Sequence, residues 1–197
     1  MSRNAPRTFI AVPLEEKVRA RIVALQEELA NAGTDVKWVE PENLHVTLLF
    51  LGEVDLRDSV EICRVIRGVT ADLPPFAMSA SGLGCFPNPR RPRTLWVGVS
   101  EGNDELLELH GRIENELLNL GGYRREERGY TPHITLGRIK TDDVTAELRT
   151  ALKEETDWQG GRQTVREVHV LTSELRSTGP TYTALSREKL RADGDIE

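Results

Sequence analysis

Apolar residues recur at helical spacing in four separate stretches of this 197-residue chain. In the first stretch, Val18, Ile22, Leu25 and Leu29 form one stripe between charged positions, which is the pattern of an amphipathic helix that buries a single face. Gly33 follows the stripe, and glycine commonly ends a helix. The same pattern predicts helices over residues 15–32, 56–70, 103–120 and 142–154.

Short apolar and β-branched runs separate these predicted helices, and glycine, proline and asparagine bound them, as is typical of strands. Alternation is weak in the run 76–86, where two glycines indicate a bend or bulge. We expect a short extended piece at 36–39 and strands over residues 7–14, 44–51, 76–86, 93–99, 133–136, 164–172 and 181–185.

The second half of the chain repeats the order of elements in the first half. Arg7 and Arg93 begin similar strands 86 residues apart, and His45 and His133 lie 88 residues apart. A near-constant offset across several elements indicates an internal duplication, and two copies of this length are too few and too long for a solenoid.

We therefore expect an α+β fold in which residues 1–190 form a single bilobal domain. Repeats at about 7–86 and 93–172 predict two β-α-β-α-β lobes related by a pseudo-twofold axis. Each lobe would be a mainly antiparallel sheet with helices on its outer face, and an active-site groove would lie between the lobes. The acidic residues 191–197 are expected to form a frayed tail.

The most informative motif occurs twice, as His45-Val-Thr-Leu and His133-Ile-Thr-Leu. Alternation along a strand places the histidine and the threonine on one face and the apolar residues on the other. One copy would mean little, but two copies at equivalent positions of a duplicated fold can place two imidazoles and two hydroxyls across one groove.

That set of groups suits the cleavage of a phosphoester. One histidine can take a proton from water while the other gives a proton to the leaving oxygen, both near pH 7. The hydroxyls of Thr47 and Thr135 can bind phosphate oxygens on which charge builds in the transition state. Such a reaction requires no metal and no cofactor, and neither motif has a third ligand at the spacing of a zinc site.

Composition and charge narrow the class of protein further. The net charge of −6 argues against a protein that coats long nucleic acid. Cys63 and Cys85 lack metal-ligand spacing and are expected to be reduced thiols, and no apolar run has the length of a membrane span. His110 and His169 have no counterpart in the other repeat, and we interpret both as structural. Basic residues cluster at 90–93 and at Arg124, Arg125 and Arg128.

The sequence resembles the two-histidine phosphoesterase superfamily, and within it the bacterial and archaeal RNA 2′,3′-cyclic phosphodiesterases, formerly called 2′-5′ RNA ligases. The resemblance covers nearly the whole chain, including the stretches at 7–14, 38–53, 86–93, 132–136 and 173–180. It implies an enzyme that opens a 2′,3′-cyclic phosphate at an RNA 3′ end to leave a 2′-phosphate.

The same resemblance implies a role for each motif residue. His45 would be the proton donor to the departing 3′ oxygen, and His133 the proton acceptor that activates water. Thr47 and Thr135 would hold the phosphate. The residues alone do not distinguish acid from base, because the pseudo-symmetry makes the two histidines interchangeable. The reverse reaction, with a 5′-hydroxyl in place of water, would form a 2′-5′ linkage.

Phe50 and Arg138 stand five residues after the two histidines. In the family these positions resemble substrate residues, an aromatic ring that can stack on the terminal base and a guanidinium that can reach the phosphate. Plain alternation instead places both on the face opposite the histidines. Either the strands twist or bulge there, or the two residues have packing roles.

The resemblance implies RNA ends with a 2′,3′-cyclic phosphate as partner, such as tRNA halves, for a cytoplasmic monomer without a protein or membrane partner. Two alternatives stay open. One is an enzyme with the same chemistry on another substrate, a 2′-5′ oligonucleotide or a cyclic nucleotide. The other is an RNA-end binding protein without turnover.

Overall fold

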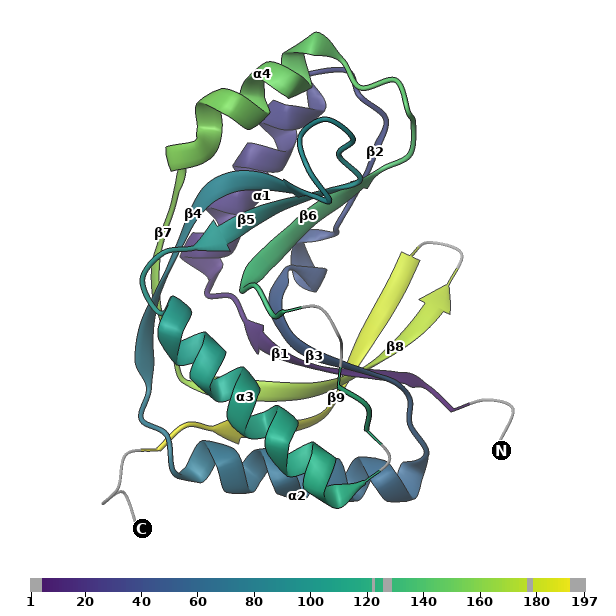
Figure 1. Ribbon diagram of the computed structural model, residues 1–197, viewed down its shortest axis with the longest axis vertical. Helices are drawn as coiled ribbons and strands as arrows, with labels where there is room; N and C mark the ends of the chain where they lie inside the picture. The colour runs from purple at the N-terminus through teal and green to yellow at the C-terminus, as the bar shows by residue number, and fades with distance from the viewer. Residues whose placement is uncertain (1–4, 122, 126–128, 177–178, 192–197) are drawn as a thin grey trace.

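A computed structural model describes residues 5–121, 123–125, 129–176 and 179–191, which form four α-helices and one nine-stranded sheet (Figure 1). The helices are α1 (Glu16–Ala30), α2 (Leu56–Ala71), α3 (Asn103–Leu120) and α4 (Ala146–Glu154). The strands are β1 (Arg7–Pro13), β2 (Val36–Trp38), β3 (His45–Glu53), β4 (Phe76–Phe86), β5 (Thr94–Val99), β6 (His133–Ile139), β7 (Gln159–Val165), β8 (Glu167–Arg176) and β9 (Gly179–Lys189). Two 3₁₀ turns, η1 (Pro41–Asn43) and η2 (Glu155–Asp157), complete these elements.

The four predicted helices are confirmed, and their ends follow from capping. In α1 the four residues of the predicted apolar stripe are all buried. The side chain of Asp55 accepts hydrogen bonds from the first backbone amides of α2. The prediction that the last helix begins at residue 142 is wrong. That helix begins at Ala146, because the Thr145 hydroxyl accepts a hydrogen bond from the backbone N–H of Leu148 and caps it there.

The closing strand predicted over 164–172 is also wrong as a single element. The chain breaks it at Arg166 into β7, which pairs with β4, and β8, which pairs with β1. The alternation of buried residues changes phase at this break, since Val165 and Val168 lie three positions apart. The sequence analysis did not use that change of phase, because β-branched residues continue on both sides of it.

All pairs of neighbouring strands in the described part of the sheet are antiparallel, in the order β7-β4-β5-β6-β3-β1-β8-β9, with β2 beside β6. The middle of this order is narrow, because β3 and β6 pair through one register position, Val46 opposite Ile134. The sheet therefore consists of two lobes that meet at the two motif strands.

Figure 1 shows α1 and α4 at the upper lobe, formed by β7, β4, β5, β6 and β2, and α2 and α3 at the lower lobe, formed by β3, β1, β8 and β9. This confirms the predicted α+β class with antiparallel sheets and helices on their outer faces. The lobes differ from our expectation in one respect, because neither is a contiguous half of the chain. Each half contributes strands and one helix to both lobes.

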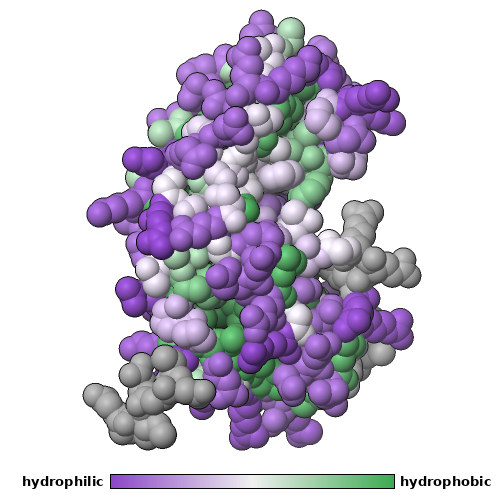
Figure 2. Space-filling view, turned by 60° about the vertical axis from the view of Figure 1, so that its left-hand side comes forward, coloured by the Kyte–Doolittle hydropathy of each residue, from purple (hydrophilic) through white to green (hydrophobic). Residues whose placement is uncertain are grey.

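The core fills the space between each part of the sheet and its helices. Its fully buried side chains include Ile10, Ile66, Leu106, Ile113 and Ile134. Hydrophobic side chains reach the surface in small patches between hydrophilic ones on the face shown in Figure 2. Across the described ranges, no helix is long and apolar enough to cross a membrane.

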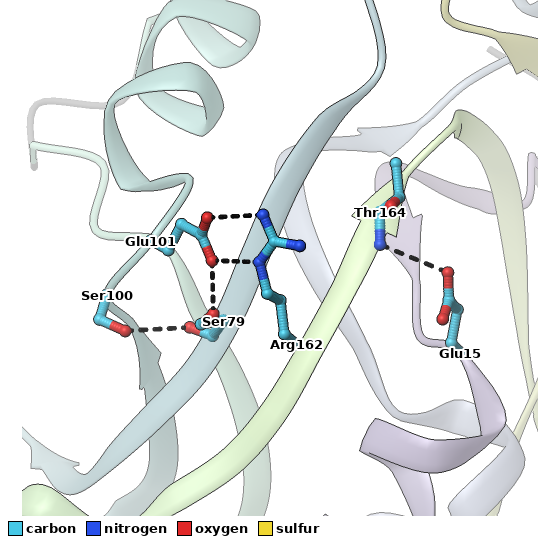
Figure 3. A network of polar contacts seen from close by, with 6 residues as sticks. All are labelled: Glu15, Ser79, Ser100, Glu101, Arg162 and Thr164. Atoms are coloured by element: carbon cyan, nitrogen blue, oxygen red, sulfur yellow. Dashed lines mark hydrogen bonds and ion pairs between the residues drawn. The ribbon is translucent and has the colours of Figure 1, made fainter.

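A polar network fastens the outer strand β7 to β4 (Figure 3). The carboxylate of Glu101 accepts hydrogen bonds from Nε and Nη2 of Arg162 at 2.7 and 2.9 Å and from the Ser79 hydroxyl at 2.8 Å. These bonds, that of Arg162 foremost, lower the pKa of Glu101 to about 2. On the other side of β7, the Glu15 carboxylate accepts a hydrogen bond from the backbone N–H of Thr164.

Candidate active site

The two His-x-Thr-Leu motifs lie side by side at the junction of the lobes. Val46 of β3 and Ile134 of β6 are paired, and both are fully buried. Since successive side chains in a strand project to opposite faces, the residues before and after this pair share the other face. The structure therefore brings four of the predicted site residues together, namely His45, Thr47, His133 and Thr135.

The same kind of hydrogen bond orients both imidazoles. Nδ1 of His45 lies 2.7 Å from the backbone oxygen of Asn43, and Nδ1 of His133 lies 2.7 Å from that of Thr131. A carbonyl oxygen only accepts, so each Nδ1 carries the proton and donates. In each neutral ring Nε2 is then the free base.

The Thr47 hydroxyl lies 2.9 Å from Nε2 of His45. Because Nδ1 of this ring holds the proton, the hydroxyl donates and Nε2 accepts. The threonine of the motif therefore touches the reactive nitrogen of its own histidine, two residues away on the same face of β3.

Burial keeps both histidines neutral in the absence of a bound anion. It lowers the pKa of His45 to about 4, partly opposed by the bond to the Asn43 carbonyl, and a charge on His133 lowers it further. Burial also lowers the pKa of His133, opposed by the Thr131 carbonyl. A charge on one ring opposes a charge on the other, so the charging of both rings at once is disfavoured.

A groove of about 970 Å³ opens in front of the motif strands. His45, Thr47 and Thr135 line it, and β9 contributes Tyr182. His133 instead lines a smaller neighbouring pocket of about 240 Å³, which shares Thr47 and Phe50 with the groove. The two histidines thus line neighbouring pockets that share Thr47 and Phe50.

Phe50 and Arg138 line the groove, and a bulge in each motif strand explains how. The register between β1 and β3 shifts at Leu48, and the register between β5 and β6 shifts at Leu136. In each strand two consecutive residues after the threonine are buried, and the next side chain returns to the histidine face. Phe50, 60% exposed, and Arg138 therefore lie on the groove side rather than the core side.

Aromatic rings surround each imidazole, and the sequence analysis did not identify them. His45 packs against Phe9 and Tyr182, with ring centroids 5.0 and 5.6 Å away. His133 lies against Phe86 and Trp96 at 5.1 and 6.2 Å. These rings come from β1, β9, β4 and β5, and no local pattern marks them because only the sheet topology brings them to the motifs.

His110, interpreted from the sequence as structural, contacts the site through Tyr130. The two rings stack at 4.1 Å with an interplanar angle of 13°. Nδ1 of His110 bonds to the backbone oxygen of Leu48 at 3.0 Å, and the Tyr130 hydroxyl donates to that of Thr47 at 3.0 Å. This pair therefore joins the bulge of β3 to the segment that leads into His133.

The other candidate residues that the structure describes do not line the groove, although His169 lines an adjacent pocket that also includes His45. Nε2 of His169 pairs with the Glu167 carboxylate at 2.7 Å. Arg125 pairs with Glu114 at 2.9 Å, and Arg93 of the other basic cluster pairs with Asp142. Arg128 falls outside the described residues. Cys63 and Cys85 are free thiols. Among the side chains that the structure places, no three ligating groups gather as a metal site.

Comparison with known proteins gives consistent matches along the chain. The sequence model described as LigT-like phosphoesterase matches residues 12–96 and again residues 97–182. An RNA 2′,3′-cyclic phosphodiesterase of Methanothermobacter thermautotrophicus is 38% identical over 90% of this chain and 95% of its own. One of Thermotoga maritima is 37% identical over 91% of this chain and 92% of its own.

Solved structures show the same architecture. The protein TT0787 of Thermus thermophilus superposes with a TM-score of 0.82 at 28% identity, covering 95% of this chain and 99% of that chain. Escherichia coli LigT complexed with 3′-AMP gives a TM-score of 0.78 with the same coverage, and at 24% identity this likeness concerns the fold.

Proposed function

The chain belongs to the LigT-like phosphoesterase family, and we propose that it opens RNA 2′,3′-cyclic phosphates by two-histidine acid–base catalysis to leave a 2′-phosphate. It is an RNA 2′,3′-cyclic phosphodiesterase, like the relatives that match it over 90% of its length. The observation that carries this mechanism is the pair of imidazoles held by equivalent Nδ1 bonds on one face of β3 and β6.

In the proposed reaction the phosphate of the RNA end lies between the two Nε2 atoms. Nε2 of His133 takes a proton from water while the water oxygen attacks phosphorus. The P–O3′ bond breaks on the opposite side, and His45 gives its proton to the departing O3′. The product carries a 2′-phosphate and a free 3′-hydroxyl, while His133 has gained one proton and His45 has lost one.

The bound anion supplies the protonation state that this reaction requires. Without a bound anion the pKa of His45 is about 4, chiefly because the ring is buried, but a phosphate in the groove places a negative charge next to the ring and favours its charged form. The proton donor is therefore loaded when substrate binds. Once Nε2 of His45 carries its proton, it no longer accepts a hydrogen bond from Thr47. The hydroxyls of Thr47 and Thr135 can then donate to the non-bridging oxygens as their charge grows.

Arg138 and Phe50 complete the proposed substrate site. Both project into the cleft, the guanidinium toward a phosphate and the exposed ring toward the terminal base, on which it can stack with little base preference. We further propose that the protein acts as a cytoplasmic monomer on RNA ends such as tRNA halves, and that with a 5′-hydroxyl in place of water it forms a 2′-5′ linkage.

The test is product analysis on a short RNA with a 2′,3′-cyclic phosphate end, in the presence of a chelator. We expect a 2′-phosphate, and we expect its loss in His45→Ala and in His133→Ala. His169→Ala, which removes a histidine already paired with Glu167, is the matched control and should keep its activity.

Other outcomes would redirect the proposal. A 3′-phosphate product would keep the two histidines but reverse the substrate in the cleft. Loss of activity with the chelator would overturn the metal-free mechanism. Tight binding of the RNA end without turnover would favour the RNA-end binder, and preference for an internal 2′-5′ linkage would favour the related phosphodiesterase.

A further inference from the structure

The two walls of the groove carry opposite charge. The wall formed by β2 and β6 presents Lys37, Arg138 and Lys140. The facing wall, from the ends of β3 and β8, presents Glu53 and Glu174. Arg7 on the second wall and Glu40 beside the first are the exceptions. In a protein of net charge −6, this basic wall is a local departure from the overall charge.

The three cations of the basic wall differ from most arginines that the structure describes. Eight other arginines among the described residues are held in ion pairs. By contrast, Lys37, Arg138 and Lys140 form no ion pair with any carboxylate that the structure describes. All three are exposed to the groove, so their charge is available to a ligand.

The register places like charges directly opposite each other. Lys37 pairs with Arg138 across β2 and β6, and Lys140 follows two residues after Arg138, on the same face. Like charges at directly opposite positions of an antiparallel pair destabilise the sheet. Such an arrangement becomes favourable when a polyanion lies along it, because the anion relieves the repulsion between the cations.

The basic wall also has length and direction. Thr135 and Arg138 of β6, and Lys140 directly after it, follow His133 in this order along the chain. At about 3.3 Å per residue, the path from Thr135 to Lys140 covers about 16 Å, and stacked nucleotides in one strand advance about 3.4 Å each. The wall therefore extends well beyond a single terminal nucleotide.

We propose that Lys37 and Lys140 form a subsite for the backbone phosphates of single-stranded RNA upstream of the reacting end, so that the strand follows the β2–β6 wall away from the histidines. This inference rests on the proposed function, since it takes the reacting phosphate to lie between His45 and His133. It makes the enzyme selective for oligonucleotide ends over mononucleotides, by charge rather than by base identity.

The test compares a mononucleoside 2′,3′-cyclic phosphate, which has no upstream phosphate, with a five-nucleotide RNA that has the same end. The variant is Lys37→Ala/Lys140→Ala. The control is Lys17→Ala/Lys153→Ala, which removes the same charge from exposed positions of α1 and the end of α4, away from the groove.

We expect the wild-type protein and the control to prefer the five-nucleotide RNA. In the Lys37/Lys140 variant, kcat/KM for the RNA should fall about tenfold at about 0.15 M salt, because each lost contact removes about 0.7 from the salt exponent for single strands. The slope of log(kcat/KM) against log[salt] should become shallower by about 1.4, and the mononucleotide reaction should be unchanged.

A second comparison changes the ligand instead of the protein. Replacing the upstream phosphates of the RNA by uncharged methylphosphonates should cost the wild-type protein the same factor and cost the lysine variant almost nothing. If the losses of kcat/KM caused by the lysine variant and by the methylphosphonates add up, the subsite is overturned. An equal fall of kcat/KM for the mononucleotide and the RNA in the lysine variant would also overturn it. Failure of the wild-type protein on both substrates would instead refute the proposed function.

Discussion

Replacing Tyr130 by phenylalanine tests whether the link between the two motif strands matters for catalysis. The substitution removes one hydroxyl, whose bond to the Thr47 carbonyl is 3.0 Å long, and keeps the ring that stacks on His110. Burial of this phenol raises its pKa, so the hydroxyl is a neutral donor at any pH of interest. The change is therefore confined to a single hydrogen bond.

The expected loss of stability follows from the environment of that bond. A hydrogen bond contributes about 1 kcal/mol net, and a buried carbonyl left without a donor costs about 1–3 kcal/mol. We expect the free energy of unfolding to fall by about 1–2 kcal/mol, which for a chain of this length lowers Tm by about 3–6 °C.

The effect on catalysis should appear in kcat. Tyr130 lies three residues before His133, and its bond anchors that segment to the carbonyl of Thr47, whose hydroxyl contacts His45. If the lost bond loosens the placement of the two histidines by the same 1–2 kcal/mol, kcat falls about 5- to 30-fold. KM for the cyclic phosphate should change less, because this bond makes no contact with the phosphate.

Thr172→Val is the matched control. It also removes one hydroxyl that donates to a backbone carbonyl, that of Thr183 at 3.3 Å, at a buried position in the β8–β9 pair. Calorimetric unfolding and steady-state kinetics on both variants separate the two roles. A Tyr130→Phe protein that loses stability like Thr172→Val but keeps its kcat would refute a positioning role for Tyr130.

Three further predictions follow from the geometry. Because the pKa of His45 is lowered to about 4, the unfolded chain takes up a proton below about pH 6.5 that the folded protein refuses. Stability should thus fall between about pH 6.5 and 4, and calorimetry of His45→Gln should show a weaker pH dependence in that window. A Cβ at Gly84 would lie 2.3 Å from the ring of Trp96. Gly84→Ala should therefore cost about 1–3 kcal/mol and alter the near-UV circular dichroism of the indole; an unchanged Tm would contradict this contact. The pKa of Glu101, about 2 through its bonds to Arg162 and Ser79, should rise toward 4.5 in Arg162→Gln, as read by NMR titration. The stabilisation from this ion pair should be complete above about pH 4.5 and be lost as the pH falls toward 2.

Periodicity predicted the helices well because each one buries a single face. The stripe of Val18, Ile22, Leu25 and Leu29 becomes the buried face of α1. Only the start of α4 was misplaced, because charged residues before Thr145 resemble a first helical turn. The hydroxyl of Thr145, which accepts from the helix itself, determines the real beginning.

Alternation predicted the position of the histidines and threonines but could not place the residues after them. A β-bulge adds one residue to one strand and changes the face of everything that follows. The sequence around Phe50 and Arg138 shows no glycine or proline pattern common to both bulges, so the choice between groove and core could not be made from the strand alone.

Contacts between residues far apart in the sequence could not be predicted from local sequence patterns. Tyr182 reaches His45 from the last strand, and Trp96 reaches His133 from β5. His110 has a helical neighbourhood typical of a surface residue, yet it bonds to the Leu48 carbonyl 62 residues away. Contacts of this kind depend on which strands are adjacent, and the sheet order exchanges elements between the halves of the chain.

Because each half of the chain contributes strands and one helix to both lobes, neither half should fold without the other. A fragment ending at Pro87 would hold β1, β3 and α2 of one lobe but lack β8, β9 and α3, and its β4 would have no β5 or β7. Neither fragment has a complete layer to bury, so each should be unfolded alone. Mixed together, two fragments cut in the hairpin loop between β4 and β5 should reassemble into an active complex. The catalytic pair would then arise only on association, since each fragment supplies one histidine.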